Sequence, residues 1–429
     1  LDGDIFYFVW NTSLNSDGVY NISVYFNDSY GLANNFSASN SSILFNITVD
    51  NTRPTVVFIL PQNNANLSGS LENITINGID ATTGVKNVTV QNGTGGNNIS
   101  MFLARGSINN GNWTTAIDTT EYLDGQINFT IDVTDFNNNS NNSEFVTVTI
   151  DNTKPTVSFV NPAGNANVSG SVNITVTLAD TTLGVKNATV QNGTNGNNIS
   201  MTLIEGTVSE GNWSLTINSL EHSDGLTNFT INANDFVGNN NESEFVTLTI
   251  DNTQPTVSFV VPQNASSVTG TINLTMTATD ANTGVETVAI QNNTGGNYVS
   301  TTFLEGSITA GNWTLQLDTT NLNDGDNIFT VNTTDFAGVS NNLLFLNLSV
   351  DNSGPSVTFN SPVSNANLSG TQSVNVTVTD AVTQVDNVSI TLVNGSGIVF
   401  NFTIEQSGNN YNDSLSTASF SDGSYNISV

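Results

Sequence analysis

The chain has 429 residues, no cysteine, and 36 acidic against 5 basic residues, which gives a formal net charge of −31. So negative a chain is unsuited to nucleic acid or anionic lipid, and is compatible with cations, basic partners or simple solubility. Without a disulfide framework, its stability has to come from packed cores. We find no signal peptide and no apolar stretch of the roughly 20 residues that a membrane span needs.

One phrase recurs four times, at intervals of about 100 residues. It reads DNTKPTVSFVNP at Asp151–Pro162, and close copies begin at Asp50, Asp251 and Asp351. Asp-Asn-Thr is a turn signal, and the two prolines flank an alternating apolar run that suits an edge strand. We interpret the phrase as a linker followed by the first strand of a module. The predicted modules are 1–49 (the second half of a module), 50–150, 151–250, 251–350 and 351–429 (lacking its last strand), as expected of a piece of a longer protein.

From Asp151 to Ile250 the sequence alternates apolar and polar residues in seven short runs rich in Val, Ile, Thr and Phe. Clusters of Gly, Asn, Asp and Ser separate the runs at the spacing of an antiparallel sandwich, without helical periodicity. The predicted strands are Thr156–Val160, Val172–Leu178, Lys186–Gln191, Ile199–Ile204, Trp213–Ile217, Thr227–Ala233 and Glu244–Ile250. The predicted fold class is all-β, with tandem immunoglobulin-like β-sandwich modules of about 100 residues.

Short motifs recur at matching places in the modules: Asp-Asn-Thr-x-Pro at the boundary, Asp180-Thr-Thr-Leu-Gly-Val, Gly-Asn-Trp, Asp224-Gly and Asp235-Phe-Val-Gly-Asn. In these motifs the chain resembles the tandem bacterial and archaeal Ig-like repeats of large cell-surface proteins. The resemblance covers nearly the whole chain and implies the architecture, whereas such modules serve as spacers, adhesins and lattice units alike. Two residues depart from the motifs: Gln384 replaces a glycine and Val339 an asparagine.

Asn-x-Ser/Thr triplets number roughly three dozen, about twice what the composition gives by chance. Many have an apolar middle residue, as in Asn173-Ile-Thr. In a strand that residue enters the core while Asn and Thr face solvent, so a glycan would not disturb packing. A plain solvent-facing pattern is the alternative, although Asn is a poor strand former. We predict N-glycans at Asn21, Asn46, Asn73, Asn87, Asn128, Asn173, Asn187, Asn228, Asn273, Asn312, Asn375 and Asn387.

Aspartate recurs in the linker and in the loops after the second and sixth strands of each module. Alternating strands bring those loops to the end where the linker enters, so we expect the carboxylates to converge. Converging carboxylates repel unless a cation lies among them, and hard oxygen ligands suit Ca²⁺. The alternative is that each aspartate caps its own turn, and spacing alone leaves both open. The candidate calcium ligands at the module junctions are Asp50, Asp80, Asp135, Asp151, Asp180, Asp235, Asp251, Asp280, Asp335, Asp351 and Asp380.

The sequence shows no constellation of catalytic residues, and we expect no enzyme. The single histidine, His222, lies in a predicted turn and is interpreted as incidental. Core anchoring, rather than sugar binding, is predicted for Trp113, Trp213 and Trp313. Turn chemistry alone is expected of the aspartates that precede glycine at the opposite end of each module: Asp124, Asp224 and Asp324.

The leading hypothesis is a structural, N-glycosylated cell-surface protein, part of an extracellular filament, sheath or surface layer. A cysteine-free, repetitive and acidic chain with these triplets favours an archaeal source. Expected partners are further copies of the chain and covalent N-glycans, with no nucleic acid and no membrane span in this segment. The alternatives are an adhesin stalk that presents a distal binding domain, and a non-catalytic module string of a secreted hydrolase.

Overall fold

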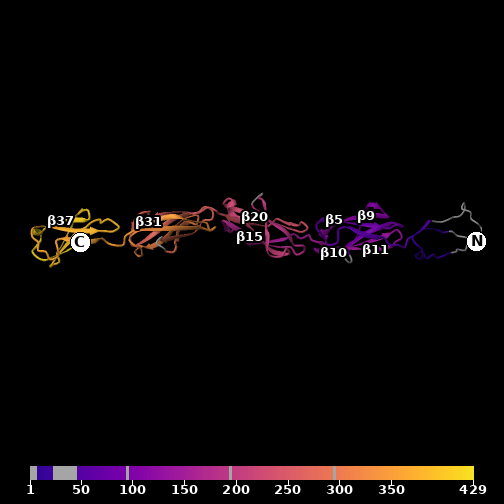
Figure 1. Ribbon diagram of the computed structural model, residues 1–429, viewed down its shortest axis with the longest axis horizontal. Coiled ribbons are helices and arrows are strands. Elements are labelled where there is room, and N and C mark those ends of the chain that lie inside the picture. The colour runs from indigo at the N-terminus through magenta and orange to yellow at the C-terminus, as the bar shows by residue number, and fades with distance from the viewer. Residues whose placement is uncertain (1–6, 23–45, 93–95, 193–195, 293–295) are drawn as a thin grey trace, which may run out of the picture. The chain divides into compact units, whose positions relative to one another are not determined.

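The computed structural model describes residues 7–22, 46–92, 96–192, 196–292 and 296–429 (Figure 1). Within these ranges every regular element is a β-strand or a three-residue 3-10 helix. No helix among the described residues has the length and apolar character needed to cross a membrane. The predicted all-β class is confirmed.

The chain divides into two compact units. The first comprises Leu1–Ala163, Asn173–Thr216 and Asn228–Val246, and the second comprises Gly164–Val172, Ile217–Thr227 and Thr247–Val429. The repeat that follows Asp50 lies in the first unit and the repeat that follows Asp251 lies in the second. Both sheets of each of these two repeats therefore lie within a single unit.

The repeat after Asp50 forms two sheets, in the strand orders β3–β5–β9–β8 and β4–β12–β10–β6–β7, with β11 paired to β10. Its pairs are antiparallel except β4 with β12, which is parallel. The first sheet contains β3 (Thr55–Leu60), β5 (Ser70–Ile79), β9 (Asn110–Asp118) and β8 (Phe102–Ser107). The second contains β4 (Ala65–Leu67), β12 (Phe145–Ile150), β10 (Gly125–Asp135), β6 (Val85–Asn92), β7 (Asn98–Ser100) and β11 (Ser140–Asn141), and η2 (Thr119–Glu121) follows β9.

The repeat after Asp151 has the same strand orders, β13–β15–β19–β18 and β14–β22–β20–β16–β17, with β21 paired to β20. The first sheet contains β13 (Thr156–Asn161), β15 (Ser171–Ala179), β19 (Glu210–Asn218) and β18 (Thr202–Gly206). The second contains β14 (Asn167–Val168), β22 (Phe245–Ile250), β20 (Gly225–Asp235), β16 (Val185–Asn192), β17 (Asn198–Ser200) and β21 (Asn240–Asn241), and η3 (Ser219–Glu221) follows β19.

The repeat after Asp251 keeps the orders β23–β25–β29–β28 and β24–β31–β30–β26–β27. Its strands are β23 (Thr256–Val261), β24 (Ser266–Val268), β25 (Thr271–Thr279), β26 (Val285–Asn292), β27 (Val299–Ser300), β28 (Thr302–Ser307), β29 (Ala310–Asp318), β30 (Gly325–Asp335) and β31 (Ser340–Val350), with η4 (Thr319–Asn321).

The repeat after Asp351 forms the sheets β32–β33–β37–β36 and β35–β34–β38. Its elements are β32 (Ser356–Ser361), β33 (Thr371–Thr379), β34 (Ser389–Asn394), β35 (Val399–Thr403), β36 (Glu405–Ser407), β37 (Asn410–Ser416), η5 (Thr417–Ser419) and β38 (Tyr425–Ser428). At the other end of the chain, η1 (Thr12–Leu14) precedes the pair β1 (Gly18–Asn21) and β2 (Asn46–Val49).

The core of each sandwich is built from every second residue of its strands, because successive side chains point to opposite faces. In the first complete repeat, Ile74 in β5 and Phe129 in β10 are fully or almost fully buried and share one cluster with Trp113. The corresponding Trp213 and Trp313 are also buried, as predicted. Packing of these apolar faces is the main source of stability in a chain without disulfides.

The segment Ile199–Ile204 differs from the single strand predicted for it. It forms two strands in different sheets, since β17 pairs with β16 and β18 pairs with β19. The change of sheet occurs at Met201, which is buried and whose N–H donates to the carbonyl of Ala188 at 2.9 Å. Alternation continues through such a crossing, so periodicity does not reveal it.

Candidate metal centres

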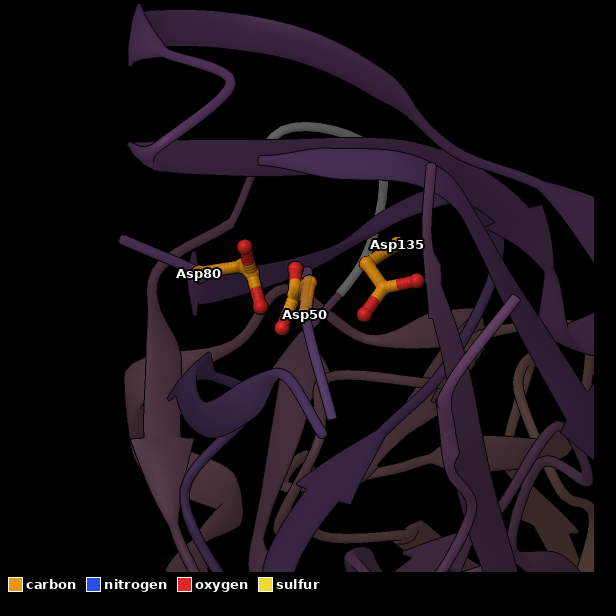
Figure 2. Close-up of side chains that lie close together, drawn as sticks. All are labelled: Asp50, Asp80 and Asp135. Atoms are coloured by element: carbon orange, nitrogen blue, oxygen red, sulfur yellow. The ribbon is translucent and has the colours of Figure 1, made fainter. Parts of the chain in front are cut away.

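Three aspartates converge at the start of each complete repeat, as the strand alternation predicts. Asp50 lies in the linker after β2, Asp80 follows β5, and Asp135 ends β10 (Figure 2). One carboxylate oxygen from each of the three lies within 4.8 Å of the other two. The same geometry recurs in two further triads: Asp151, Asp180 and Asp235; and Asp251, Asp280 and Asp335.

One carboxylate oxygen of each loop aspartate caps its own turn. Oδ1 of Asp80 accepts hydrogen bonds from the N–H groups of Thr83 at 2.9 Å and Gly84 at 2.8 Å. Gly84 has a φ of +85°, and a Cβ there would lie 2.9 Å from Ile108, so the turn requires glycine. The fourth repeat has Gln384 at this place, and its next strand, β34, begins only at Ser389. Turn capping by backbone N–H groups therefore exists, but it uses only Oδ1 of each loop carboxylate.

The second carboxylate oxygen, Oδ2, has no hydrogen-bond partner in several of these side chains. All nine aspartates are at most 5% exposed. In the second triad Oδ2 of Asp151 and of Asp180 is buried without a hydrogen-bond donor. In the third triad the same is true of Oδ2 of Asp280 and of Asp335. Burying a charged oxygen without a partner is costly, and a cation among the three carboxylates would remove that cost.

Burial and mutual repulsion raise the pKa of one aspartate in the second triad and of one in the third. Burial, together with the charges of Asp180, Asp235 and Asp124, raises the pKa of Asp151 to about 6. Burial also raises the pKa of Asp335, with Asp251 and Asp280 adding to the shift, while amide hydrogen bonds oppose it. The basic linker residues Arg53 and Lys154 are exposed. A cation from solution is therefore the natural counter-charge.

The triads fit an oxygen-preferring cation of the size of Ca²⁺. Oxygens on opposite sides of such an ion, at 2.3–2.6 Å from it, lie about 4.6–5.2 Å apart. One oxygen from each carboxylate lies within 4.8 Å of the other two, which is compatible with three ligands around a single ion. Buried triads at repeated positions could thus bind metal ions.

The aspartates that precede glycine do more than the expected turn chemistry. Oδ1 of Asp124 accepts a hydrogen bond from the N–H of Asn152 at 2.8 Å, and its Oδ2 accepts one from the Thr153 hydroxyl. Asp224 and Asp324 bind Asn252 and Asn352 in the same way, each at 2.8 Å. These aspartates belong to no triad among the described residues, but each binds the following linker, because the far end of one repeat is where the next linker begins.

The linker asparagine also takes part in the junction, which was not expected from the sequence. The Nδ2 of Asn152 donates to the carbonyl of Thr119 at 2.8 Å, and its Oδ1 accepts from the N–H of Gly69 at 3.0 Å. The neighbouring Asp151 instead joins the triad of the following repeat. Asn152 thus attaches the linker to the preceding repeat, and the adjacent Asp151 attaches it to the following one. The available signal was the invariant Asp-Asn of all four linker phrases.

The fourth set has only two of the predicted ligands among the described residues. The Thr383 hydroxyl donates to Oδ2 of Asp351 at 2.6 Å and approaches Oδ1 of Asp380 at 3.4 Å. Asp351 and Asp380, together with Asp324, line an open cleft of about 240 Å³. Asp351 is half-buried, so this site is more accessible than the complete triads.

The predicted glycosylation sites mostly face solvent. Ten of the twelve asparagines are exposed, while Asn312 and Asn375 are half-buried. Asn312 accepts a hydrogen bond from the Thr277 hydroxyl at 2.7 Å, so its amide is engaged. The middle residues Ile174 and Phe229 are fully buried, as the strand geometry predicts. Ser23, the third residue of the Asn21 triplet, lies outside the described residues.

Two antiparallel sheets with this topology, repeated about every 100 residues, define a tandem of immunoglobulin-like sandwiches. The family model "Bacterial Ig-like domain (group 3)" matches residues 4–107 and 111–207, and "Bacterial Ig domain" matches residues 255–331 and 355–429. The chain consists of tandem bacterial Ig-like domains. Such domains are typical of cell-surface or secreted proteins.

Several solved multi-domain structures are similar to the chain at low sequence identity. Fibronectin(III)-like modules of Clostridium thermocellum CbhA are 18% identical, with 46% of this chain and 94% of theirs covered and a TM-score of 0.27. Titin domains I67–I69 are 11% identical, with 71% and 100% covered and a TM-score of 0.35. The ICAM-5 D1–D4 fragment is 12% identical, with 88% and 98% covered and a TM-score of 0.32. No curated protein matches the chain.

Proposed function

We propose that this chain is a structural protein of the cell surface, without enzymatic activity, whose Ig-like domains are joined at Ca²⁺-binding junctions. It carries N-glycans and assembles with further copies into an extracellular filament, sheath or surface layer. The triplet-rich, cysteine-free and acidic sequence favours an archaeal source.

The proposal rests on one observation: in each complete repeat, a residue of the linker is itself a member of a buried triad. In the first unit, Asp151 contributes to a buried triad of one repeat while Asn152 is hydrogen-bonded to the preceding repeat. An ion at the triad would hold Asp151 to two loops and so restrict bending of the linker. Restricted linkers suit a protein with a mechanical role.

Electron microscopy of the native material tests the assembly, and calcium titration of the chain tests the junctions. Regular polymers or a lattice that loosens with a chelator is the expected result. A monomeric chain that extends from a distal binding domain would instead favour the adhesin stalk, and attachment to a catalytic domain would favour the hydrolase module string.

A further inference from the structure

The three complete triads differ in how their carboxylates are satisfied, and the difference lies in two positions near them. The first position is residue 83, 183 or 283, in the turn after the second strand. The second is residue 139, 239 or 339, in the turn after the sixth strand. Each position holds a hydrogen-bond donor in two repeats and an apolar residue in the third.

The residue at the first position determines whether Oδ2 of the linker aspartate receives a side-chain hydrogen bond. The Thr83 hydroxyl donates to Oδ2 of Asp50 at 2.5 Å, and the Thr283 hydroxyl donates to Oδ2 of Asp251 at 2.6 Å. The second repeat has Leu183 there, and Oδ2 of Asp151 is buried without a partner. Replacing threonine by leucine thus leaves one carboxylate oxygen of the second triad unsatisfied.

The residue at the second position determines whether Oδ2 of the aspartate that ends the sixth strand receives a side-chain hydrogen bond. Nδ2 of Asn139 donates to Oδ2 of Asp135 at 2.8 Å, and Nδ2 of Asn239 donates to Oδ2 of Asp235 at 2.6 Å. The third repeat has Val339, and Oδ2 of Asp335 is buried without a partner. The third triad therefore lacks a donor at a different carboxylate from the second.

We propose that the triads are graded cation sites: those of Asp151 and Asp251 bind Ca²⁺ at least about tenfold more tightly than that of Asp50. This inference rests on the proposed function of the triads. Thr83 and Asn139 both donate hydrogen bonds to carboxylate oxygens of the first triad, and those bonds have to be weakened when an ion takes the same oxygens. The other two triads each retain unpartnered oxygens, so the ion compensates a cost that the metal-free protein bears.

Donor substitutions in the full chain test the grading. After removal of metal with a chelator, Ca²⁺ is titrated by calorimetry into the parent chain and into Leu183→Thr, Val339→Asn and Thr83→Leu. We expect Leu183→Thr and Val339→Asn each to weaken one tight site by about tenfold, equivalent to about 1.4 kcal/mol. Thr83→Leu should convert the weak site into a tight one. Leu183→Val adds no donor and serves as the matched control.

Thermal unfolding in chelator gives a second readout. In chelator, Leu183→Thr should raise the melting temperature, because the new hydroxyl satisfies Asp151 without an ion, whereas Leu183→Val should not.

If Ca²⁺ binds to all three triads alike and the donor variants leave its affinity unchanged, the grading is wrong while the calcium junction stands. Tighter binding by Leu183→Thr would make the hydroxyl a ligand and also overturn the grading. If the parent chain takes up no Ca²⁺, the proposed function itself fails.

Discussion

At the scale of the residue, the two oxygens of a loop carboxylate have different surroundings. In Asp180, Oδ1 accepts the N–H groups of Thr182, Leu183 and Gly184, while Oδ2 is buried and unpartnered. The cap occupies Oδ1, which leaves Oδ2 as the oxygen that a cation could take without breaking the turn hydrogen bonds. Turn capping and metal binding are therefore compatible interpretations of the same residue.

Asp180→Asn separates the two tasks. The amide oxygen can still cap the turn, but the site loses one of three negative charges, so we expect its calcium affinity to fall roughly tenfold or more. The triads of Asp50 and Asp251 should keep theirs. Calcium titration provides the measurement, with Glu244→Gln as a control, because it removes the same charge from an exposed side chain of the same repeat. Equal effects of the two variants would contradict a specific site.

The raised pKa of Asp151 predicts a pH dependence for the metal-free protein. Its carboxyl has a pKa near 3.8 in the unfolded chain but about 6 in the folded one. Folding therefore favours the protonated form, and stability contributed by this group is present below pH 4 and is lost as pH rises toward 6.

Relative to Asp151→Asn, the parent chain should thus lose up to about 3 kcal/mol of unfolding free energy between pH 4 and pH 7. Denaturant unfolding in a chelator measures the difference at each pH. A difference that stays constant over this range, or that grows in favour of the parent chain, would contradict the prediction.

At the scale of the element, the strands carry two patterns at once. In β15 the apolar residues Val172, Ile174, Val176 and Leu178 enter the core, while Asn173 and Thr175 lie on the opposite face. The Asn173 side chain is exposed, and its oxygen accepts a hydrogen bond from the Thr216 hydroxyl at 2.5 Å. A glycan on the asparagine nitrogen would thus leave the packed face untouched.

Thr175→Ala tests glycosylation on this strand without changing the asparagine. In native material we expect the mass to fall by one glycan in addition to the small side-chain difference, because the triplet is destroyed. Intact-mass measurement decides this, and Thr177→Ala, which belongs to no triplet, is the control. A native chain with the mass of the bare polypeptide would rule out glycans altogether.

At the scale of the whole molecule, the linkers determine how far bending is possible. Asn252 and Thr253 bind Asp224, and the adjacent Asp251 belongs to the third triad. The Thr253 hydroxyl bond also lowers the pKa of Asp224, which keeps this partner charged. On the other side, the Thr283 hydroxyl donates to Oδ2 of Asp251. An ion in the triad is expected to add to this attachment and to restrict bending further.

We therefore expect removal of calcium to shorten the chain's maximum dimension in small-angle scattering, as the linkers begin to bend. The combined variant Asp80→Asn, Asp180→Asn, Asp280→Asn should resemble the chelated parent and should not respond to chelator. An unchanged maximum dimension would mean that the linker hydrogen bonds suffice and that calcium has no mechanical role.

The sequence by itself determined the fold class and the places where the aspartates meet. Strand alternation reports burial directly, and the return of alternate loops to one end of a sandwich follows from chain direction alone. The two-residue β14, the crossing at Met201 and the attachment of Asp124 to the next linker were decided only by tertiary structure. They depend on interactions between residues far apart in sequence, which leave no local period. The same holds for Leu183 and Val339, whose importance appears only once the unpartnered oxygens of Asp151 and Asp335 are seen beside them.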